Sequence, residues 1–282
     1  MQIDKINNLL ELFYNQYQKE NKESIFLQSL NELDIKYSWG DVYLNINKLS
    51  EEISKHIKEG DRCLLVSENR PEWMISDLSI MLSKGVTVPA YTSYTERDYE
   101  YIIDDCTPAI IIVSDETQYK KIKDIIPKKN FIKKIIHFEK IENIDEEFNI
   151  NIHDIFKQDN YRKKNFSNLN IKRKDMACII YTSGTQGNPK GVMLSHGGII
   201  NNCEGAYDLL KIFISKKPKF LTWLPLSHSY EHTVQFVQIF VGAKVFYAES
   251  IDKLIKNMSK CSPEIMTAVP RFYQNLYQKI NT

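Results

Sequence analysis

Short apolar runs alternate with amphipathic segments over most of this 282-residue chain. The runs are rich in Ile, Leu and Val and are bounded by Gly, Pro or Ser, which predicts buried strands. Continuously apolar strands separated by helices are typical of sheets covered on both faces, so the pattern predicts an α/β fold of mainly parallel sheets covered by helices. The predicted strands are 24–30, a short one near Ile35, 62–67, 86–91, 109–114, 134–138, 177–181, 220–224, 244–248 and 264–269.

The segments between these runs have apolar residues at intervals of three and four, as a helix with one buried face requires. Ser38 with Asp41, and Thr95 with Asp98, resemble capping boxes, while Gly60 and Gly85 stand where helices are expected to stop. The predicted helices are 3–19, most of 38–60, 71–84, 95–106, 116–126, 197–213, 228–241, 250–260 and 270–280.

The pattern weakens over residues 139–174, where charged residues and asparagine become frequent. We interpret this stretch as a surface insertion or linker that contains one helical turn at 152–156. It divides the chain into a first α/β unit at about 24–138 and, after a polar loop at 181–191, a second α/β unit at about 192–282.

Net charge gives no reason to expect nucleic acid as a partner. Lys and Arg total 37 against 36 Asp and Glu, a net charge of +1. The basic run 216–219 could touch anionic lipid at the periphery of a membrane, but we interpret it as a solvated turn. No apolar run reaches the roughly 18 residues of a membrane span, Met1 does not begin a signal peptide, and the five cysteines form no C-x-x-C, so we expect a cytoplasmic protein with free thiols.

The loop 181–191, Tyr-Thr-Ser-Gly-Thr-Gln-Gly-Asn-Pro-Lys-Gly, is the densest group of anion donors in the chain. Glycines let the backbone approach an anion, hydroxyls donate hydrogen bonds, and Lys190 adds a positive charge, so the loop predicts a phosphate cradle. It is not a Walker loop, because Pro189 precedes the lysine, and the dinucleotide motif G-x-G-x-x-G is absent. The alternative is a solvated hairpin loop.

Tyr181 to Gly191 resembles the signature loop of the adenylate-forming superfamily, Y-T-S-G-T-T-G-x-P-K-G, with Gln186 in place of the second threonine. Other segments resemble the long-chain fatty-acid CoA ligase branch, and the resemblance runs from about residue 24 to the last residue. These segments are S-E-N-R-P-E-W at 67–73, V-T-V-P-A-Y at 86–91, L-P-L-S-H-S-Y-E at 224–231 and T-A-V-P-R at 267–271.

The resemblance implies an enzyme that joins a fatty acid to ATP as an acyl-adenylate and then transfers the acyl group to CoA. It assigns the β- and γ-phosphates of ATP to the donors of the loop, with Mg²⁺ bridging the phosphates. A hydroxyl of the loop can bind that ion, and we expect Thr182 to do so. It places His228 against the acyl carboxylate, whereas a histidine at such a strand-to-helix corner could also be a satisfied core residue. The assigned phosphate-binding residues are Thr182, Ser183, Gly184, Thr185, Gly187 and Lys190.

A second enzyme class competes for the same histidine. His228-Ser-Tyr-Glu-His232 matches H-x-x-E-H, in which two histidines one helical turn apart bind zinc and the glutamate acts as a general base in peptide hydrolysis. The motif is short, no third ligand is identifiable, and it leaves the loop unexplained, so a zinc peptidase is a remote alternative.

The chain departs from the family after its last matching segment. The Y-G-x-T-E segment, the ribose-binding aspartate and the C-terminal domain with its catalytic lysine, which the family has, are absent from this sequence. We therefore expect residues 1–282 to form an incomplete adenylation domain that is inactive alone and is completed by the product of an adjacent gene. The alternative is a non-catalytic remnant or a nucleotide-binding module.

Overall fold

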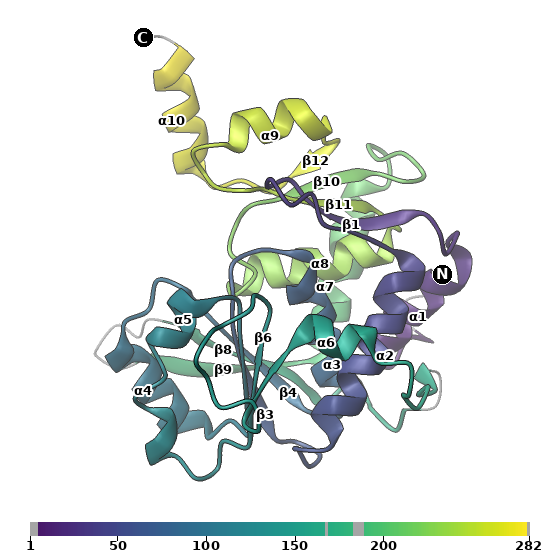
Figure 1. The fold of residues 1–282 in the computed structure, drawn as a ribbon. Coiled ribbons are helices and arrows are strands. Elements are labelled where there is room, and N and C mark those ends of the chain that lie inside the picture. Colours follow the sequence, from purple (N-terminus) through teal and green to yellow (C-terminus); the bar gives the residue numbers. More distant parts are fainter. Residues whose placement is uncertain (1–4, 167–168, 183–188, 281–282) are drawn as a thin grey trace.

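The computed structural model describes residues 5–166, 169–182 and 189–280, and in this part of the chain two β-sheets carry helices on their faces (Figure 1). The larger sheet has the strand order β7-β6-β5-β3-β4-β8-β9, and the smaller has the order β12-β10-β11-β1-β2. The larger contains β3 (Arg62–Val66), β4 (Val86–Ala90), β5 (Ile110–Val113), β6 (Lys134–His137), β7 (Asn149–Asn151), β8 (Met176–Thr182) and β9 (Lys190–Ser195). The smaller contains β1 (Ile25–Ser29), β2 (Lys36–Ser38), β10 (Lys219–Thr222), β11 (Lys244–Tyr247) and β12 (Ile265–Met266).

Neighbouring strands of the described residues are parallel except for two pairs, β1 with β2 and β8 with β9. This confirms the predicted α/β fold of mainly parallel sheets covered by helices. The antiparallel pair β8 and β9 flanks the predicted phosphate loop, so that loop connects two strands of a hairpin at the edge of the larger sheet.

The helices form three layers around the two sheets. A central layer lies between the sheets, and its apolar side chains share one core with residues of both (Figure 1). It consists of α1 (Leu9–Lys19), α2 (Trp39–Ser54), α3 (Pro71–Leu82), α7 (His196–Leu210) and α8 (Ser229–Phe240). The outer face of the larger sheet is covered by α4 (Glu96–Cys106) and the residues after α5 (Glu116–Lys120), and that of the smaller sheet by α9 (Leu254–Cys261) and the start of α10 (Pro270–Ile280).

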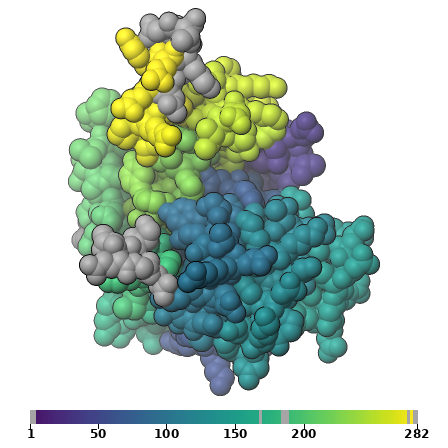
Figure 2. All heavy atoms as spheres, turned by 90° about the vertical axis from the view of Figure 1, so that its left-hand side faces the viewer, coloured from purple at the N-terminus to yellow at the C-terminus, as the bar shows by residue number. Residues whose placement is uncertain are grey.

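Alternation along the strands explains the layers. On β3, Cys63 and Leu65 enter the central core, while Leu64 and Val66 enter the outer core beneath α4. Both faces of this strand are therefore buried, as its continuously apolar sequence requires. Figure 2 shows the molecule from the side, with α9 and α10 at the top and the teal residues of the larger sheet and its covering helices below.

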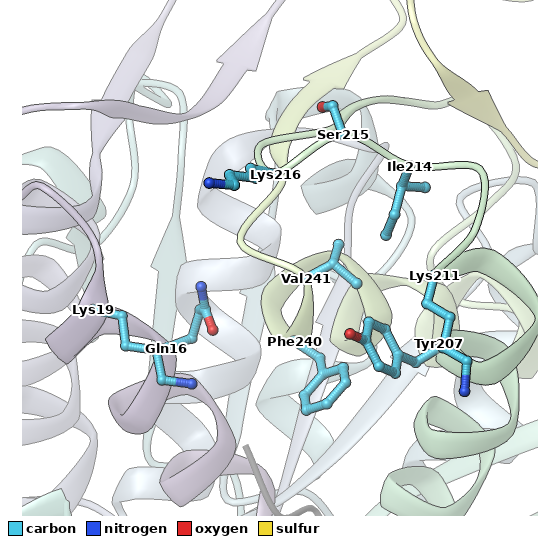
Figure 3. Close-up of a pocket in the computed structure, with 9 residues that line it drawn as sticks. All are labelled: Gln16, Lys19, Tyr207, Lys211, Ile214, Ser215, Lys216, Phe240 and Val241. Atoms are coloured by element: carbon cyan, nitrogen blue, oxygen red, sulfur yellow. The ribbon is translucent and has the colours of Figure 1, made fainter.

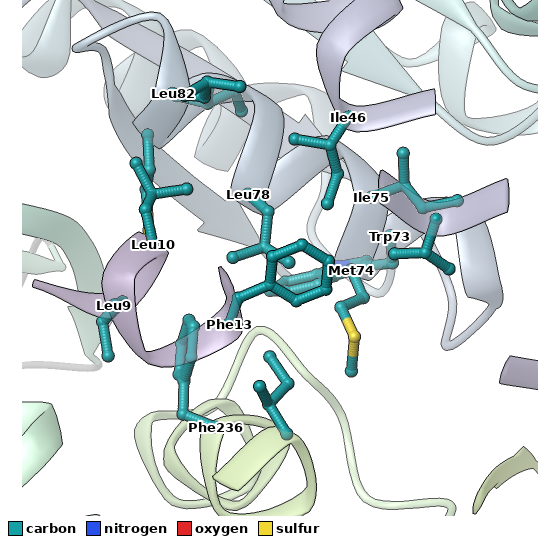
Figure 4. Packing of buried hydrophobic residues seen from close by; sticks show 14 of the residues in the cluster. Leu9, Leu10, Phe13, Ile46, Trp73, Met74, Ile75, Leu78, Leu82 and Phe236 are labelled. Atoms are coloured by element: carbon teal, nitrogen blue, oxygen red, sulfur yellow. The ribbon is translucent and has the colours of Figure 1, made fainter. Parts of the chain in front are cut away.

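The centre of the main core joins α1, α3 and α8 (Figure 4). Phe13, Trp73, Leu78 and Phe236 all have completely buried side chains. Burial of each large apolar side chain stabilises the fold by about 1.5 to 3 kcal/mol relative to exposure. This packing fixes α8 against α3 and thereby sets the position of the first turn of α8.

The predicted capping boxes are confirmed. Ser38 and Asp41 cap α2, and Thr95 and Asp98 cap α4, each with reciprocal side-chain and backbone hydrogen bonds. The predicted helix boundaries were less accurate. α1 begins at Leu9, six residues after the predicted start, because Asn8 caps it by accepting a hydrogen bond from the Glu11 N–H. α2 ends at Ser54, six residues before Gly60.

Two other helices are shorter than predicted. The helix predicted at 116–126 is the short α5, after which the backbone N–H groups of Lys121 and Ile122 bond to carbonyls three residues back. Pro127 follows within a few residues and disfavours continuation of the helix. The helix predicted at 250–260 begins at Leu254.

The segment 139–174 contains more structure than the interpretation as an insertion or linker implied. β7 adds to the edge of the larger sheet, α6 (Ile152–Lys157) contacts α2, and Phe166 is completely buried in the main core. β1 and β2, which sequence order grouped with the first unit, pair within the smaller sheet. The predicted unit boundaries themselves stay a prediction. Among the described residues, no helix is both long and apolar enough to cross a membrane.

Candidate active site

The predicted phosphate loop begins and ends on adjacent strands. Thr182, the last residue of β8, is opposite Lys190, the first residue of β9, and both are exposed. The structure thus describes two of the assigned phosphate-binding residues and brings them together at one edge of the larger sheet. The others, Ser183, Gly184, Thr185 and Gly187, lie outside the described residues.

Gly191 stands where a side chain would collide with the opposite strand. A Cβ atom at this position would lie 2.9 Å from Cγ2 of Ile179 and 3.2 Å from Cζ of Tyr181. The ring of Tyr181 occupies that space, and its hydroxyl donates a hydrogen bond to Asp105. Burial, followed by the bond to Asp105, raises the pKa of Tyr181, so its hydroxyl stays protonated and continues to donate. These contacts fix the backbone just before Thr182.

A cavity of about 340 Å³ lies at the carboxyl ends of strands from both sheets. Ligands of open α/β sheets bind at such edges. Tyr94 connects this cavity to the phosphate loop, because it follows the lining residues 91–93 directly and its hydroxyl donates to the Tyr181 carbonyl at 3.5 Å. The cavity is lined by Ser67, Glu68, Asn69, Tyr91, Thr92, Ser93, Trp223, Pro225, Ser227, Ala248, Glu249, Ser250 and Ile251.

His228 is exposed and caps the N-terminus of α8, where its Nδ1 accepts the backbone N–H of Tyr230 at 3.2 Å. It follows Ser227 of the cavity lining. Asn69 fixes the preceding loop, since its side chain donates to the Leu224 carbonyl at 2.6 Å and accepts from the Leu226 N–H at 3.0 Å. The structure therefore contradicts the alternative of a satisfied core histidine, because the imidazole lies at the surface.

His232, one turn further along α8, is buried and fully paired. Its Nε2 lies 2.8 Å from Oδ2 of Asp77 on α3, and its Nδ1 lies 3.7 Å from Sγ of Cys178 on β8. Burial alone would lower the pKa of His232, but the negative charge of Asp77 raises it well above its usual value. Gln235 donates to the same Asp77 oxygen at 3.1 Å. This buried pair joins α8 to α3.

Glu231, the glutamate of the H-x-x-E-H pentamer, is also buried. Its Oε2 accepts a hydrogen bond of 2.6 Å from the Thr267 hydroxyl, while Oε1 has no partner in the described part of the chain. Burial raises the pKa of this carboxyl to about 7. The bond connects the first turn of α8 to the residues that lead into α10.

These environments do not support the zinc peptidase. Both ring nitrogens of His232 are engaged, Glu231 faces Thr267, and His228 uses Nδ1 as a helix cap. Within the described ranges, no group of three or more His, Cys, Asp or Glu side chains could hold a metal ion. H-x-x-E-H arises here from a surface residue followed by two buried ones, a coincidence of spacing that sequence cannot distinguish from a metal site.

Other residues singled out in the sequence divide between core and cavity. Trp73 and Phe236 are buried in the main core, Trp223 lines the cavity, and Tyr230 is exposed. Arg70 pairs with the buried Glu72 at 3.0 Å. Sequence reasoning missed the cavity residues 91–93 and 248–251. Their position directly after predicted parallel strands was the available signal, because such strands end at a common edge.

Comparison with known proteins places the chain in one family. The family model described as AMP-binding enzyme matches residues 13–281. Long chain acyl-CoA synthetase 3 of Arabidopsis thaliana is 26% identical over 257 residues, which are 86% of this chain and 38% of that protein. Long-chain-fatty-acid–CoA ligase 5 of Rattus norvegicus is 28% identical over 229 residues, 77% of this chain and 33% of that protein. The chain thus spans less than half the length of these relatives.

Solved structures share the fold. The N-terminal domain of FACL13 from Mycobacterium tuberculosis superposes with a TM-score of 0.83 at 16% identity, over 97% of this chain and 65% of that one. ATP-bound MatB from Rhodopseudomonas palustris gives a TM-score of 0.76 at 22% identity, over 96% of this chain and 51% of that one. With the family model covering nearly all of its residues, the chain belongs to the AMP-binding enzyme family.

Proposed function

We propose that this chain is the amino-terminal part of an ATP-dependent long-chain fatty-acid CoA ligase and that its loop 181–191 holds the triphosphate of ATP. The observation that carries the proposal is the hairpin that sets Thr182 opposite Lys190, at the two ends of a loop whose sequence is typical of adenylate-forming enzymes. One relative is called a long-chain acyl-CoA synthetase and another a long-chain-fatty-acid–CoA ligase, and one solved structure with this fold has ATP bound. These likenesses support the substrates ATP, fatty acid and CoA.

In this proposal Lys190 and the polar residues within the loop have separate roles. The Lys190 ammonium neutralises charge on the β- and γ-phosphates, and Ser183, Gly184, Thr185 and Gly187 donate hydrogen bonds to the same oxygens. Pyrophosphate then leaves more easily when the fatty-acid carboxylate attacks the α-phosphorus. Lys190 is exposed and opposite Thr182, which suits contact with a ligand from solvent.

Mg²⁺ fits this site only as a companion of ATP. The described residues offer no cluster of acidic or histidine ligands, so the phosphate oxygens would supply most of the coordination and the Thr182 hydroxyl one further oxygen. When bound, the ion would withdraw charge from the leaving pyrophosphate. We propose Thr182 as its protein ligand.

His228 is proposed to contact the acyl carboxylate. Its Nδ1 is engaged by the backbone of α8, which leaves Nε2 to donate to a carboxylate from the exposed side of the ring. The adjacent cavity has Trp223 and Ile251 among its lining residues and could accept apolar atoms of the substrate. Holding the carboxylate near the phosphate loop lowers the entropic cost of adenylate formation.

The complete reaction requires residues beyond those described. The chain spans 38% of one relative and 33% of another, and we propose that the remaining portion is supplied by further polypeptide, such as the product of an adjacent gene. The competing proposal is a nucleotide-binding module without catalysis. A cytoplasmic location is part of the main proposal, because ATP and CoA are water-soluble substrates.

ATP affinity tests the loop, and the expected changes are large. Lys190→Ala and Thr185→Ala should each weaken ATP binding by about 10- to 100-fold, the worth of one charge-assisted hydrogen bond, as measured by titration calorimetry. Lys128→Ala, an exposed lysine distant in sequence, is the control and should bind as the parent does. Equal ATP affinity of all four proteins, or no binding by any, would refute the proposal.

Fatty-acid-dependent exchange of labelled pyrophosphate into ATP separates ligase from binding module. We expect no exchange by the 282 residues alone and exchange once the complementary polypeptide is added. Binding of ATP without exchange in that mixture would favour the non-catalytic module.

A further inference from the structure

The end of α7 and the residues after it expose an unusual group of apolar side chains. Leu209, Ile212 and Phe213 have exposed fractions of 74%, 75% and 77%. Single exposed apolar residues are normal, but three within five positions form a patch that calls for a partner. These three side chains and four nearby lysines are termed the apolar–lysine patch: Leu209, Ile212, Phe213, Lys211, Lys216, Lys217 and Lys219.

The patch is locally basic although the chain is nearly neutral. Residues 208–219 contain four lysines and one aspartate, whereas the whole chain has a net charge of +1. The facing carboxylates are already engaged. Asp208 pairs with Lys211 at 2.7 Å, Glu20 with Lys217 at 3.2 Å, and Glu264 accepts hydrogen bonds from Ser215.

Lys216 of the patch and Lys19 on α1 lack such a partner in the described part of the chain. Neither Lys19 nor Lys216 has a carboxylate within 4.0 Å in the described part of the chain. Their positive charge is therefore available to an external anion.

A cavity of about 340 Å³ lies next to the patch and is bordered by these lysines (Figure 3). The figure shows Lys19 and Gln16 on α1 facing the loop that bears Lys216, with Tyr207 and Phe240 on the opposite side. The two rings meet edge to face with centroids 5.0 Å apart. The cavity is roomy enough for a phosphate group, and Lys19, Lys211 and Lys216 are among the residues that line it.

We propose that the apolar–lysine patch binds the surface of a bilayer that contains anionic lipids. Ile212 and Phe213 insert among the acyl chains, and the lysines contact the lipid phosphates, one of which can enter the cavity. The basic run 216–219, interpreted from sequence as a solvated turn, gains this role because the structure leaves the apolar residues just before it in the chain exposed.

The position of the patch in the fold sets how the molecule would lie on the bilayer. Lys219 is the first residue of β10, so the patch lies at the amino edge of the smaller sheet, while the candidate active-site cavity lies at the carboxyl edge. A molecule bound through the patch would keep that cavity directed away from the lipid. A second copy of the chain is a poorer occupant, because its patch would bring like charges together.

Vesicle binding tests the inference independently of ATP. The probes are vesicles of phosphatidylcholine alone and vesicles of phosphatidylcholine mixed with phosphatidylglycerol, with bound protein measured by flotation. We expect binding to the mixed vesicles, weakened by salt, and about tenfold weaker binding after Ile212→Asp with Phe213→Asp or after Lys216→Gln with Lys219→Gln.

Matched controls keep the result interpretable. Leu33 is an exposed leucine elsewhere, and Lys123 and Lys128 are exposed lysines elsewhere, so Leu33→Asp and the double change Lys123→Gln with Lys128→Gln should bind as the parent does. Thermal unfolding of all variants should match, because the altered side chains are exposed. Equal loss in patch and control variants, absence of parent binding, or a patch variant that only dissociates a dimer would overturn the proposal.

Discussion

His228 and His232 stand one turn apart on α8 in opposite environments. His228 is exposed at the helix N-terminus beside the candidate cavity, while His232 is buried and paired with Asp77 on α3. Thr182 and Lys190 resemble His228 in exposure, and Tyr181 and Cys178 resemble His232 in burial. Thr182, Lys190 and His228, the proposed ligand-binding residues, are exposed and are termed the exposed rim, whereas adjacent buried polar contacts hold the elements that carry them.

The largest expected effect comes from breaking the buried pair. Asp77→Asn leaves His232 without its counter-charge and should lower the free energy of unfolding by about 3 to 5 kcal/mol in chemical denaturation. Asp77→Leu combined with His232→Leu should restore part of that loss, because neither charge remains buried. Asp154→Asn, in an exposed pair with Lys157, is the control and should change stability by less than about 1 kcal/mol. A loss no larger than in this control would remove the distinction between rim and buried contacts.

The next effect concerns pH. In the fold the pKa of Glu231 is raised from 4.5 to about 7, so the native state retains a proton that the unfolded chain releases between those values. Its contribution to the free energy of unfolding is therefore full below about pH 4.5 and falls as pH rises towards about 7, by roughly 2 to 3 kcal/mol. Glu231→Gln should abolish this part of the pH dependence in denaturation measured from pH 5 to pH 8.

The exposed Glu204→Gln on α7 serves as the control and should keep the pH dependence of the parent. If the free energy of unfolding of Glu231→Gln changed with pH in parallel with that of the parent, the Glu231 carboxyl would have the same pKa in the native and the unfolded chain.

A smaller loss is expected at the base of the phosphate loop. Gly191→Ala places a Cβ atom 2.9 Å from Ile179 and should destabilise the protein by about 1 to 2 kcal/mol. Gly205→Ala is the same substitution, but no atom beyond its chain neighbours and its own helix backbone lies within 4 Å of the added Cβ atom. Because Gly205 lies inside α7, alanine should increase the free energy of unfolding by up to about 1 kcal/mol. Equal effects of the two substitutions on the melting temperature would contradict the close packing of Gly191 against Tyr181.

The smallest effects on stability belong to the exposed rim. Lys190→Ala should change the free energy of unfolding by less than about 0.5 kcal/mol, because its side chain is exposed. His228→Asn should do likewise, since asparagine can still cap α8. Lys190→Ala is nevertheless expected to weaken ATP binding. A stability loss in Lys190→Ala as large as that in Asp77→Asn would mean that the rim is structural.

Sequence alone determined the alternating α/β architecture, because apolar runs that predict buried strands and apolar spacings that predict helices both lie within short stretches of the chain. It also predicted the caps at Ser38 and Thr95, where local hydrogen bonds dominate, and a loop at 181–191 that follows directly on a strand. The segment 139–174 escaped this reasoning, since its weak pattern concealed β7, α6 and the buried Phe166.

Only the tertiary structure decided which polar residues are buried. The pentamer H-x-x-E-H carries no mark that His228 is exposed and His232 is paired with Asp77, a partner 155 residues away in the chain. Likewise, sequence order did not reveal that β1 and β2 complete the smaller sheet or that strands of both sheets end around one cavity. The reason is physical: burial and long-range pairing depend on how distant segments pack, and that free energy is shared among residues that no local pattern connects.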